Sequence, residues 1–298
     1  MASLYTHQSA NIRKTWLLMT VFFLLVIGVG WVISWYYNNV SILWVAAIVS
    51  VVMNIGAYWF SDKVAIAASG AHPADEREFR ELHRLVENLA ITAGLPKPKV
   101  YIIDDPAPNA FATGRNPEHA AIAVTTGLMQ RLERNELEGV LAHELSHIGN
   151  RDILVMTVAV VLVGVVSMVA DFFLRMSFYG GNRDSDNRTG PLMAIAAIAA
   201  VILAPIAAQL IQLAVSRKRE FLADASGALI TRYPEGLASA LEKISGYGAP
   251  MKRASHATAH LFISNPFGAH EAGRFIAKLF ATHPPVEARI SALRGQRV

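Results

Sequence analysis

The amino-acid sequence predicts a mainly α-helical membrane protein, with four hydrophobic helices in two hairpins and a water-exposed α+β domain between them. Of the 298 residues, 53% are hydrophobic and only 17% are charged, whereas soluble domains carry about 25% charged residues. The mean hydropathy is +0.34. The apolar residues also gather in four long segments, as membrane-spanning helices require.

The first hydrophobic hairpin is expected within residues 1–60, after an N-terminal tail. Residues 15–37 carry no charge and, at about 1.5 Å per helical residue, are long enough to cross roughly 30 Å of hydrocarbon. After the turn Asn38-Asn39, residues 40–60 form the second apolar segment. A cleaved signal peptide is disfavoured, because its apolar core would not exceed about 15 residues.

Residues 61–152 are expected to form a cytoplasmic domain with a small antiparallel sheet. His72-Pro73 opens a predicted helix that Gly94 ends, because apolar residues recur between them at intervals of three and four. Three short strands are expected, over residues 99–103, 110–113 and 120–125. The second and third of these strands are predicted to form a hairpin.

The second hydrophobic hairpin is expected within residues 153–215. Its two segments, 153–174 and 192–215, are each long enough to cross a bilayer. Asp171 lies near the far end of the first of them, where a charge costs less than at mid-membrane. The alternative is a pair of buried apolar helices within a larger domain. Residues 216–298 follow as a second cytoplasmic part.

Basic residues predict which side of the membrane the domain occupies. They flank the hydrophobic segments on one face of the expected topology, at Arg13, Lys14, Lys63, Arg151, Arg217, Lys218 and Arg219. The positive-inside rule therefore predicts that both termini and the water-exposed domain are cytoplasmic. A nucleic-acid partner is not expected despite the net charge of +4, because the basic residues form no long tract.

The sequence His143-Glu144-Leu145-Ser146-His147 is the strongest chemical signal. It lies in a helix that is expected to start at a capping-box-like Asn135 and Glu138 and to extend through Asn150. Residues four apart share a helical face, so both imidazoles can reach one tetrahedral zinc ion. Glu144 then lies beside the open coordination position, where a carboxylate can take a proton from water. Since the chain has no cysteine, further ligands must be His, Asp or Glu.

Glu220 and Asp224 repeat the spacing of four, just after the fourth hydrophobic segment. A catalytic zinc ion usually takes three protein ligands, so Glu220 is the candidate third ligand and Asp224 can orient a ligand histidine. The alternative for Glu220 is an ordinary charge that neutralises the neighbouring basic residues. Pairing Glu220 with the histidines requires that the chain between them cross the membrane an even number of times.

These residues resemble the HtpX family of bacterial inner-membrane zinc metallopeptidases, which is related to the prenyl-protein endopeptidases of eukaryotes. The resemblance covers essentially the whole chain and rests on the His-Glu-x-x-His helix together with the later Ser-Arg-x-x-Glu-x-x-Ala-Asp segment. It implies one zinc ion per chain, bound by His143, His147 and Glu220, with Glu144 as the catalytic base and Asp224 beside a ligand. It also implies proteolysis of misfolded or surplus membrane proteins in envelope stress.

Other candidates lie outside this cluster. Asn109 and Phe111 belong to a strand that is either an edge for binding an extended substrate or an ordinary hairpin strand. His283 precedes two prolines and either donates to the developing oxyanion or stabilises a turn. His256 and His260 are four apart without a nearby third ligand, so packed or surface histidines are expected rather than a second metal site.

These observations together predict a membrane-bound, zinc-dependent endopeptidase of the bacterial inner membrane. Its expected partners are polypeptides, in particular membrane proteins, and the lipid bilayer. A transporter or channel is disfavoured, because the first two hydrophobic segments lack charged residues. A catalytically silent, zinc-binding chaperone or scaffold is the remaining alternative. Glu144 argues against it, because a purely structural zinc site has no use for that carboxylate.

Overall fold

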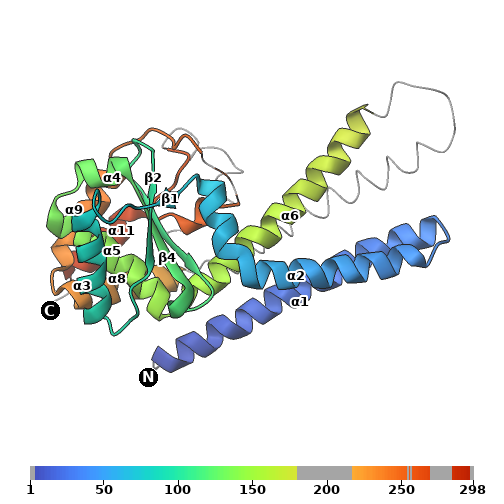
Figure 1. Cartoon of the computed structure of the whole chain (residues 1–298), viewed down its shortest axis with the longest axis horizontal. Coiled ribbons are helices and arrows are strands. Elements are labelled where there is room, and N and C mark those ends of the chain that lie inside the picture. Colours follow the sequence, from blue (N-terminus) through green and yellow to red (C-terminus); the bar gives the residue numbers. More distant parts are fainter. Residues whose placement is uncertain (1–3, 180–216, 254, 256, 269–283, 296–298) are drawn as a thin grey trace.

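The structure is a computed structural model that describes residues 4–179, 217–253, 255, 257–268 and 284–295. In chain order its elements are α1 (Leu4–Tyr36), α2 (Ser41–Ser69), β1 (His72–Pro73), α3 (Arg80–Thr92), β2 (Lys99–Ile103), β3 (Ala110–Gly114), η1 (Pro117–His119), β4 (Ala120–Thr125), α4 (Thr126–Arg131), α5 (Arg134–Gly149), α6 (Asp152–Tyr179), α8 (Arg217–Thr231), α9 (Pro234–Ser245), η3 (Ala259–Leu261) and α11 (Val286–Gly295). Figure 1 shows a rounded domain from which α1, α2 and α6 extend as a long arm.

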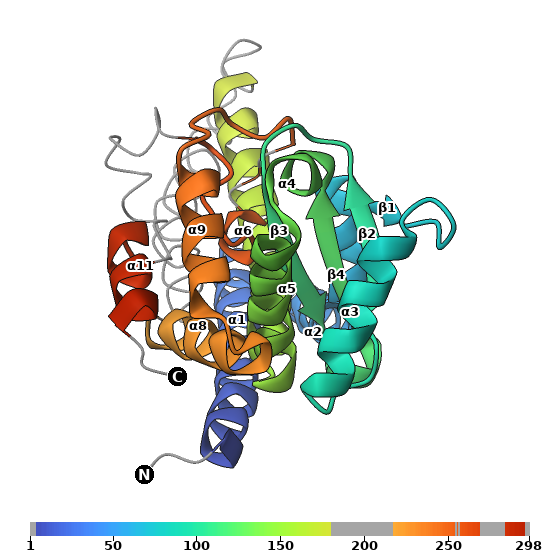
Figure 2. The same cartoon turned by 90° about the vertical axis from the view of Figure 1, so that its left-hand side faces the viewer.

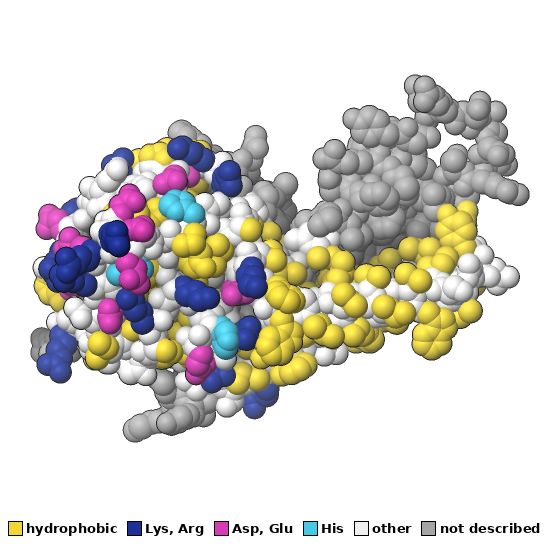
Figure 3. Space-filling view, in the orientation of Figure 1, with side chains coloured by type: hydrophobic (Ala, Val, Ile, Leu, Met, Phe, Trp, Pro, Cys, Tyr) yellow, Lys and Arg dark blue, Asp and Glu magenta, His cyan; other side chains and the backbone are white. Residues whose placement is uncertain are grey.

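Helices α1 and α2 form the first predicted hairpin. Both are long and apolar enough to cross a membrane, over Gln8–Tyr36 and Ser41–Ser69, so α2 continues past its expected end at Phe60. Large apolar side chains are exposed along the arm (Figure 3), and such a surface suits lipid rather than water. The buried face of α2 consists of small residues, which allow neighbouring helices to approach closely.

Helix α6 contains the third hydrophobic segment and packs against the first hairpin through residues such as Leu154, Val158 and Leu162. It follows α5 after a bend of 84°, at a break that includes Arg151. Within the described ranges, two helices meet the requirements of a span, or three if α5 and α6 count as one bent span. The fourth segment, 192–215, lies outside these ranges, so the prediction of four hydrophobic helices is confirmed only in part.

The sheet is mixed, and the prediction of an antiparallel sheet is wrong. Its strand order is β1-β2-β4-β3, in which β2 and β4 are parallel and the other two pairs are antiparallel. The β3–β4 hairpin matches the prediction, with Ala112 opposite Ile122. However, the chain crosses to the far edge to form β3 before β4 returns between β3 and β2. Hydrophobic periodicity predicts where strands occur but not which strands pair.

The helix expected at His72-Pro73 begins later in the chain. These two residues form the short edge strand β1 instead, where proline is tolerated because an edge strand leaves some N–H positions unpaired. The Asp75 carboxylate then accepts hydrogen bonds of 2.8 and 3.0 Å from the N–H groups of Arg77 and Glu78. Helix α3 starts after this turn and buries the predicted apolar face.

Helix α5 carries the His-Glu-x-x-His sequence, and its capping box differs from the predicted one. Glu133 and Glu136 form the box, two residues before Asn135 and Glu138. The Glu136 carboxylate accepts hydrogen bonds from the Glu133 N–H group at 2.8 Å and from Lys243 Nζ at 2.7 Å. The box itself is local, and the contact with Lys243 adds a bond from α9 to the start of α5.

Two glycines allow α5 to lie close to its neighbours, and Figure 2 shows α5 between the sheet and helices α8 and α9. A β-carbon on Gly139 would lie 2.6 Å from the backbone nitrogen of Leu237, and one on Gly227 would lie 3.0 Å from that of His143. Larger residues would push these helices apart. Helix α8 therefore lies directly beside the first histidine of the motif.

Candidate active site

The structure brings the three predicted metal ligands together from two helices that are far apart in the sequence. His143 and His147 lie on α5, and Glu220 lies on α8. The Nε2 atoms of the histidines are 3.2 Å apart, and they lie 3.9 and 3.5 Å from the Glu220 carboxylate oxygens. Tetrahedral zinc with bonds of about 2.0–2.1 Å places its ligand atoms roughly 3.3 Å apart. The three donors therefore fit one metal ion.

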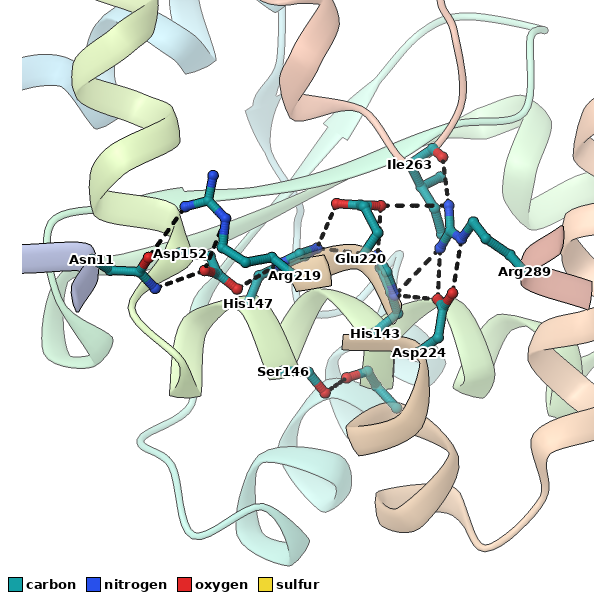
Figure 4. A network of polar contacts seen from close by, with 11 residues as sticks. Asn11, His143, Ser146, His147, Asp152, Arg219, Glu220, Asp224, Ile263 and Arg289 are labelled. Atoms are coloured by element: carbon teal, nitrogen blue, oxygen red, sulfur yellow. Dashed lines mark hydrogen bonds and ion pairs between the residues drawn. The ribbon is translucent and has the colours of Figure 1, made fainter. Parts of the chain in front are cut away.

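Two buried carboxylates orient the histidine rings (Figure 4). Asp224 lies 2.9 Å from Nδ1 of His143, and Asp152 lies 3.0 Å from Nδ1 of His147. A carboxylate at Nδ1 turns Nε2 toward the shared centre and increases the basicity of the ring. Sequence reasoning places Asp224 near the ligands but misses Asp152. The available signal was a carboxylate five residues after the second histidine of the motif.

Sequence reasoning also misses Arg289, whose fully buried guanidinium lies beside these groups. It donates hydrogen bonds of 2.9 and 2.7 Å to Asp224, and it lies 3.5 Å from the Glu220 carboxylate. Burial acts to raise the pKa of Asp224, but the hydrogen bonds from Arg289 and His143 hold that pKa below its ordinary value. An arginine late in the chain gives no local signal of this role, because its partners are assembled only by folding.

Glu144 occupies the position next to the first ligand on α5, and its side chain is buried. The backbone N–H group of Ala112 in β3 is directed toward its carboxylate. Burial raises the pKa of Glu144 to about 7. A pKa near the working pH suits a group that both takes up and returns a proton.

The charges around the histidines favour a cation at the shared centre. Burial lowers the pKa of His143. Burial also acts to lower the pKa of His147, but Asp152 and Glu220 outweigh that effect and raise the pKa to about 9. The Glu220 carboxylate lies at the Nε2 atoms, while Asp224 and Asp152 lie behind the rings at the Nδ1 atoms. A divalent cation bound at the Nε2 atoms would balance this negative charge, which is costly to bury alone.

The site is closed to solvent in this conformation. The exposed fraction is at most 5% for His143, Glu144, His147 and Glu220. Residues 257–264, which we call the cover segment, lie along the outer edge of β3. The Ile263 N–H group donates a 3.0 Å hydrogen bond to the Ala110 carbonyl, and the Ile263 carbonyl accepts a 3.3 Å bond from Arg289. The segment therefore connects the edge strand to the cluster of charges.

Asn109 and Phe111 hold the cover segment in place and are not available to a substrate in this conformation. The Asn109 side chain donates a 3.0 Å hydrogen bond to the Ser264 carbonyl and accepts one of 3.3 Å from the Ser264 N–H group. Phe111 is fully buried and packs edge-on against Phe262, with the ring centroids 5.1 Å apart. Their strand β3 does lie at the edge of the sheet.

Among the residues that the structure describes, no further histidine joins the cluster. His260 is buried, and its Nε2 atom lies 3.0 Å from the Met156 carbonyl in α6, so it packs as expected. His256 and His283 lie outside the described residues, and the structure leaves the oxyanion role of His283 as a prediction.

The sequence model of peptidase family M48 matches residues 76–297 of this chain. These residues include all three candidate metal donors and Glu144. The chain belongs to peptidase family M48. A protease HtpX homolog of Caldanaerobacter subterraneus subsp. tengcongensis is 49% identical, with 98% of each chain covered. Another, from Pyrococcus furiosus, is 48% identical, with 94% of each chain covered.

A solved structure, the crystal structure of S. mikatae Ste24p, has a similar fold. Its TM-score is 0.50 with 17% identity, and the match covers 97% of this chain and 67% of that one. Membership of family M48, the HtpX relatives and the two apolar helices make this protein a membrane-associated metalloprotease. The predicted resemblance to HtpX and the predicted class of hydrolase are thereby confirmed.

Proposed function

We propose that this M48 peptidase is a zinc-dependent endopeptidase that holds one zinc ion at His143, His147 and Glu220. The observation that carries the proposal is the convergence of these three buried donors on one point, with a carboxylate behind each histidine. Two histidines and a glutamate form the protein ligands of known catalytic zinc sites, which keep a fourth position open for water or substrate.

Glu144 is the proposed catalytic base. When bound, zinc supplies Lewis acidity toward the scissile carbonyl and lowers the pKa of water at the open position. The Glu144 carboxylate takes a proton from the attacking water and returns it to the leaving amine, a role that a pKa of about 7 supports. Asp224 and Asp152 meanwhile keep the imidazoles oriented through their Nδ1 atoms.

The edge of β3 is the proposed place for an extended polypeptide. On the outer side of β3, the Ala110 carbonyl is bonded to Ile263 and the Gly114 N–H group to Thr157. Ala112 lies between these two residues and faces Glu144. The cover segment, which contains Ile263, therefore has to move before a substrate can pair with this strand.

Two further parts of the substrate site are proposed. Contacts of a substrate with Asn109 and Phe111 belong to the opened state, because both side chains are occupied in the closed one. His283 is the proposed donor to the oxyanion that forms when water attacks the carbonyl.

The proposed location is the bacterial inner membrane, with both termini and the active site in the cytoplasm. Helices α1 and α2 supply the first membrane hairpin, and residues 153–174 and 192–215 supply the second. Residues 61–152 and 216–298 together form the peptidase domain. Basic residues beside the apolar segments support this orientation. The proposed substrates are misfolded or surplus membrane proteins in envelope stress.

Replacing Glu144 by Gln tests the proposed chemistry in the purified, full-length protein with an unfolded polypeptide as substrate. Hydrolysis is expected to fall to background while zinc content stays near one ion per chain, because the base is lost and the ligands remain. The control is Glu138→Gln, on the same helix but paired with Arg134. Turnover retained by Glu144→Gln, or by wild-type protein after chelation, would overturn the proposal.

The sidedness has a separate test. One susceptible sequence is placed at increasing distances from a span of a model membrane protein, on either face of the bilayer. Cleavage is expected on the cytoplasmic face close to the membrane. Efficient cleavage on the opposite face alone would contradict the proposed orientation.

A further inference from the structure

We propose that Asn11, in the first membrane helix, is a positioning residue for the metal ligand His147; this inference rests on the proposed zinc site. Asn11 lies near the start of α1, well before the residues that the M48 model matches. Its side chain is nevertheless only 3% exposed. Figure 4 shows it reaching Asp152, the carboxylate behind His147.

The Asn11 amide uses both of its polar atoms. Its Nδ2 donates hydrogen bonds of 2.7 Å to Asp152 Oδ1 and 3.0 Å to the Asn150 carbonyl. Its Oδ1 accepts a 3.3 Å hydrogen bond from Arg219. The other Asp152 oxygen, Oδ2, lies 3.0 Å from Nδ1 of His147. Asn11 therefore holds one oxygen of the carboxylate whose second oxygen orients the ligand.

Loss of Asn11 should loosen this carboxylate without removing a ligand. The same Asp152 oxygen lies 3.6 Å from Arg219 Nε, a longer contact than the 2.7 Å bond from Asn11. Changing a group that directly orients a metal ligand typically costs about 10–100-fold in affinity. Asn11 acts one contact farther from the metal, so a loss of about three- to tenfold is expected.

Gln8 provides a matched control on the same helix. Its Nε2 donates a 2.8 Å hydrogen bond to the Gly149 carbonyl at the end of α5. Replacing Gln8 therefore removes a contact between α1 and α5, as replacing Asn11 does, but leaves the contact with Asp152 intact. A purely structural role for Asn11 predicts that the two replacements have similar effects on zinc binding.

The first test titrates zinc against a chelator of known affinity, using full-length, metal-depleted protein in lipid nanodiscs. Asn11→Leu, which keeps the branched side-chain shape but removes both polar atoms, should raise the zinc Kd about three- to tenfold, and Gln8→Ala should change it less than about twofold. In an Asp152→Asn background, Asn11→Leu should add little, because both act through one carboxylate. A wild-type Kd for Asn11→Leu, or full additivity, would overturn the inference. Failure of wild-type protein to bind zinc would overturn the proposed function instead.

A second test needs no variant and therefore does not depend on the folding of Asn11→Leu. Binding couplings are reciprocal, so if Asn11 supports zinc binding, zinc must stabilise the docking of α1. Hydrogen–deuterium exchange in residues 5–15 of the wild-type protein should slow several-fold when zinc is added, by about the factor measured for the Kd. Unchanged exchange in a protein that binds zinc would contradict the coupling.

Discussion

The two ligand histidines are held in the same way but by different regions of the molecule. Behind His143, the supporting carboxylate and arginine belong to α8 and α11, within the rounded domain. Behind His147, the supporting carboxylate and amide belong to α6 and α1, which form the arm. Glu220 lies near both rings. The candidate metal donors therefore lie at the junction of the rounded domain and the arm.

The two supports also differ in chemistry. The domain side uses a fully buried ion pair between Asp224 and Arg289, and breaking such a pair leaves an uncompensated buried charge. On the arm side the shortest contact of Asp152 comes from the neutral amide of Asn11. Removing the ion pair behind His143 should therefore lower the free energy of unfolding. Removing the contacts behind His147 should mainly weaken metal binding.

The largest effect is expected where the two sides meet. Glu220→Ala should abolish both zinc retention and hydrolysis, because it removes the third proposed ligand, which lies beside both histidines. Metal analysis after gel filtration measures the loss, and Glu235→Ala, a half-exposed carboxylate paired with Arg294, serves as the control. If Glu220→Ala stays fully loaded, the third ligand is another residue, and His283 is the first to examine.

Arg289→Leu tests the ionic support on the domain side. The metal-free protein should lose about 3–5 kcal/mol of unfolding free energy, because Asp224 is left buried without its partner. Denaturant unfolding in detergent measures this loss. Arg294→Leu, an exposed arginine on the same helix, should cost no more than about 1 kcal/mol. Equal costs for the two variants would refute the difference in support.

Asp224→Asn and Asp152→Asn compare the two sides directly. Each should weaken zinc binding by about 10–100-fold, since each leaves the ligand in place but weakens its orientation. In the metal-free protein, only Asp152→Asn should also speed hydrogen exchange in the first turns of α1, because Asp152 is bonded to that helix through Asn11. The same rise in exchange for Asp224→Asn would mean that the two supports are not separate.

The smallest effect is expected at a contact between arm and domain that lies away from the ligands. Thr157 in α6 and Thr113 in β3 are buried with their hydroxyl oxygens 3.0 Å apart. Thr157→Val should cost about 1 kcal/mol of unfolding free energy and leave the zinc Kd unchanged. A weaker zinc affinity in this variant would show that any contact between the two regions tunes the metal.

Local patterns predict much of this molecule, because they reflect contacts within one element. The spacing of His143 and His147 needs only one helix, and the first hairpin needs only apolar length. The parallel pairing of β2 with β4 depends on strands that β3 separates in the chain, and the Lys243 contact at the start of α5 comes from a distant helix. The candidate donors and Asp224 stand out because they are spaced four apart within single helices, whereas the other supporting residues have no such pattern. Asp152, Arg289 and Asn11 are ordinary polar residues until the fold brings them to the histidines.

The candidate donors and their supporting residues come from distant parts of the chain, from α1 to α11, and this has a consequence for biogenesis. During translation, α1 enters the bilayer long before the ribosome has made Glu220, and Arg289 follows later still. The nascent chain can therefore pass through membrane insertion without an assembled hydrolytic centre.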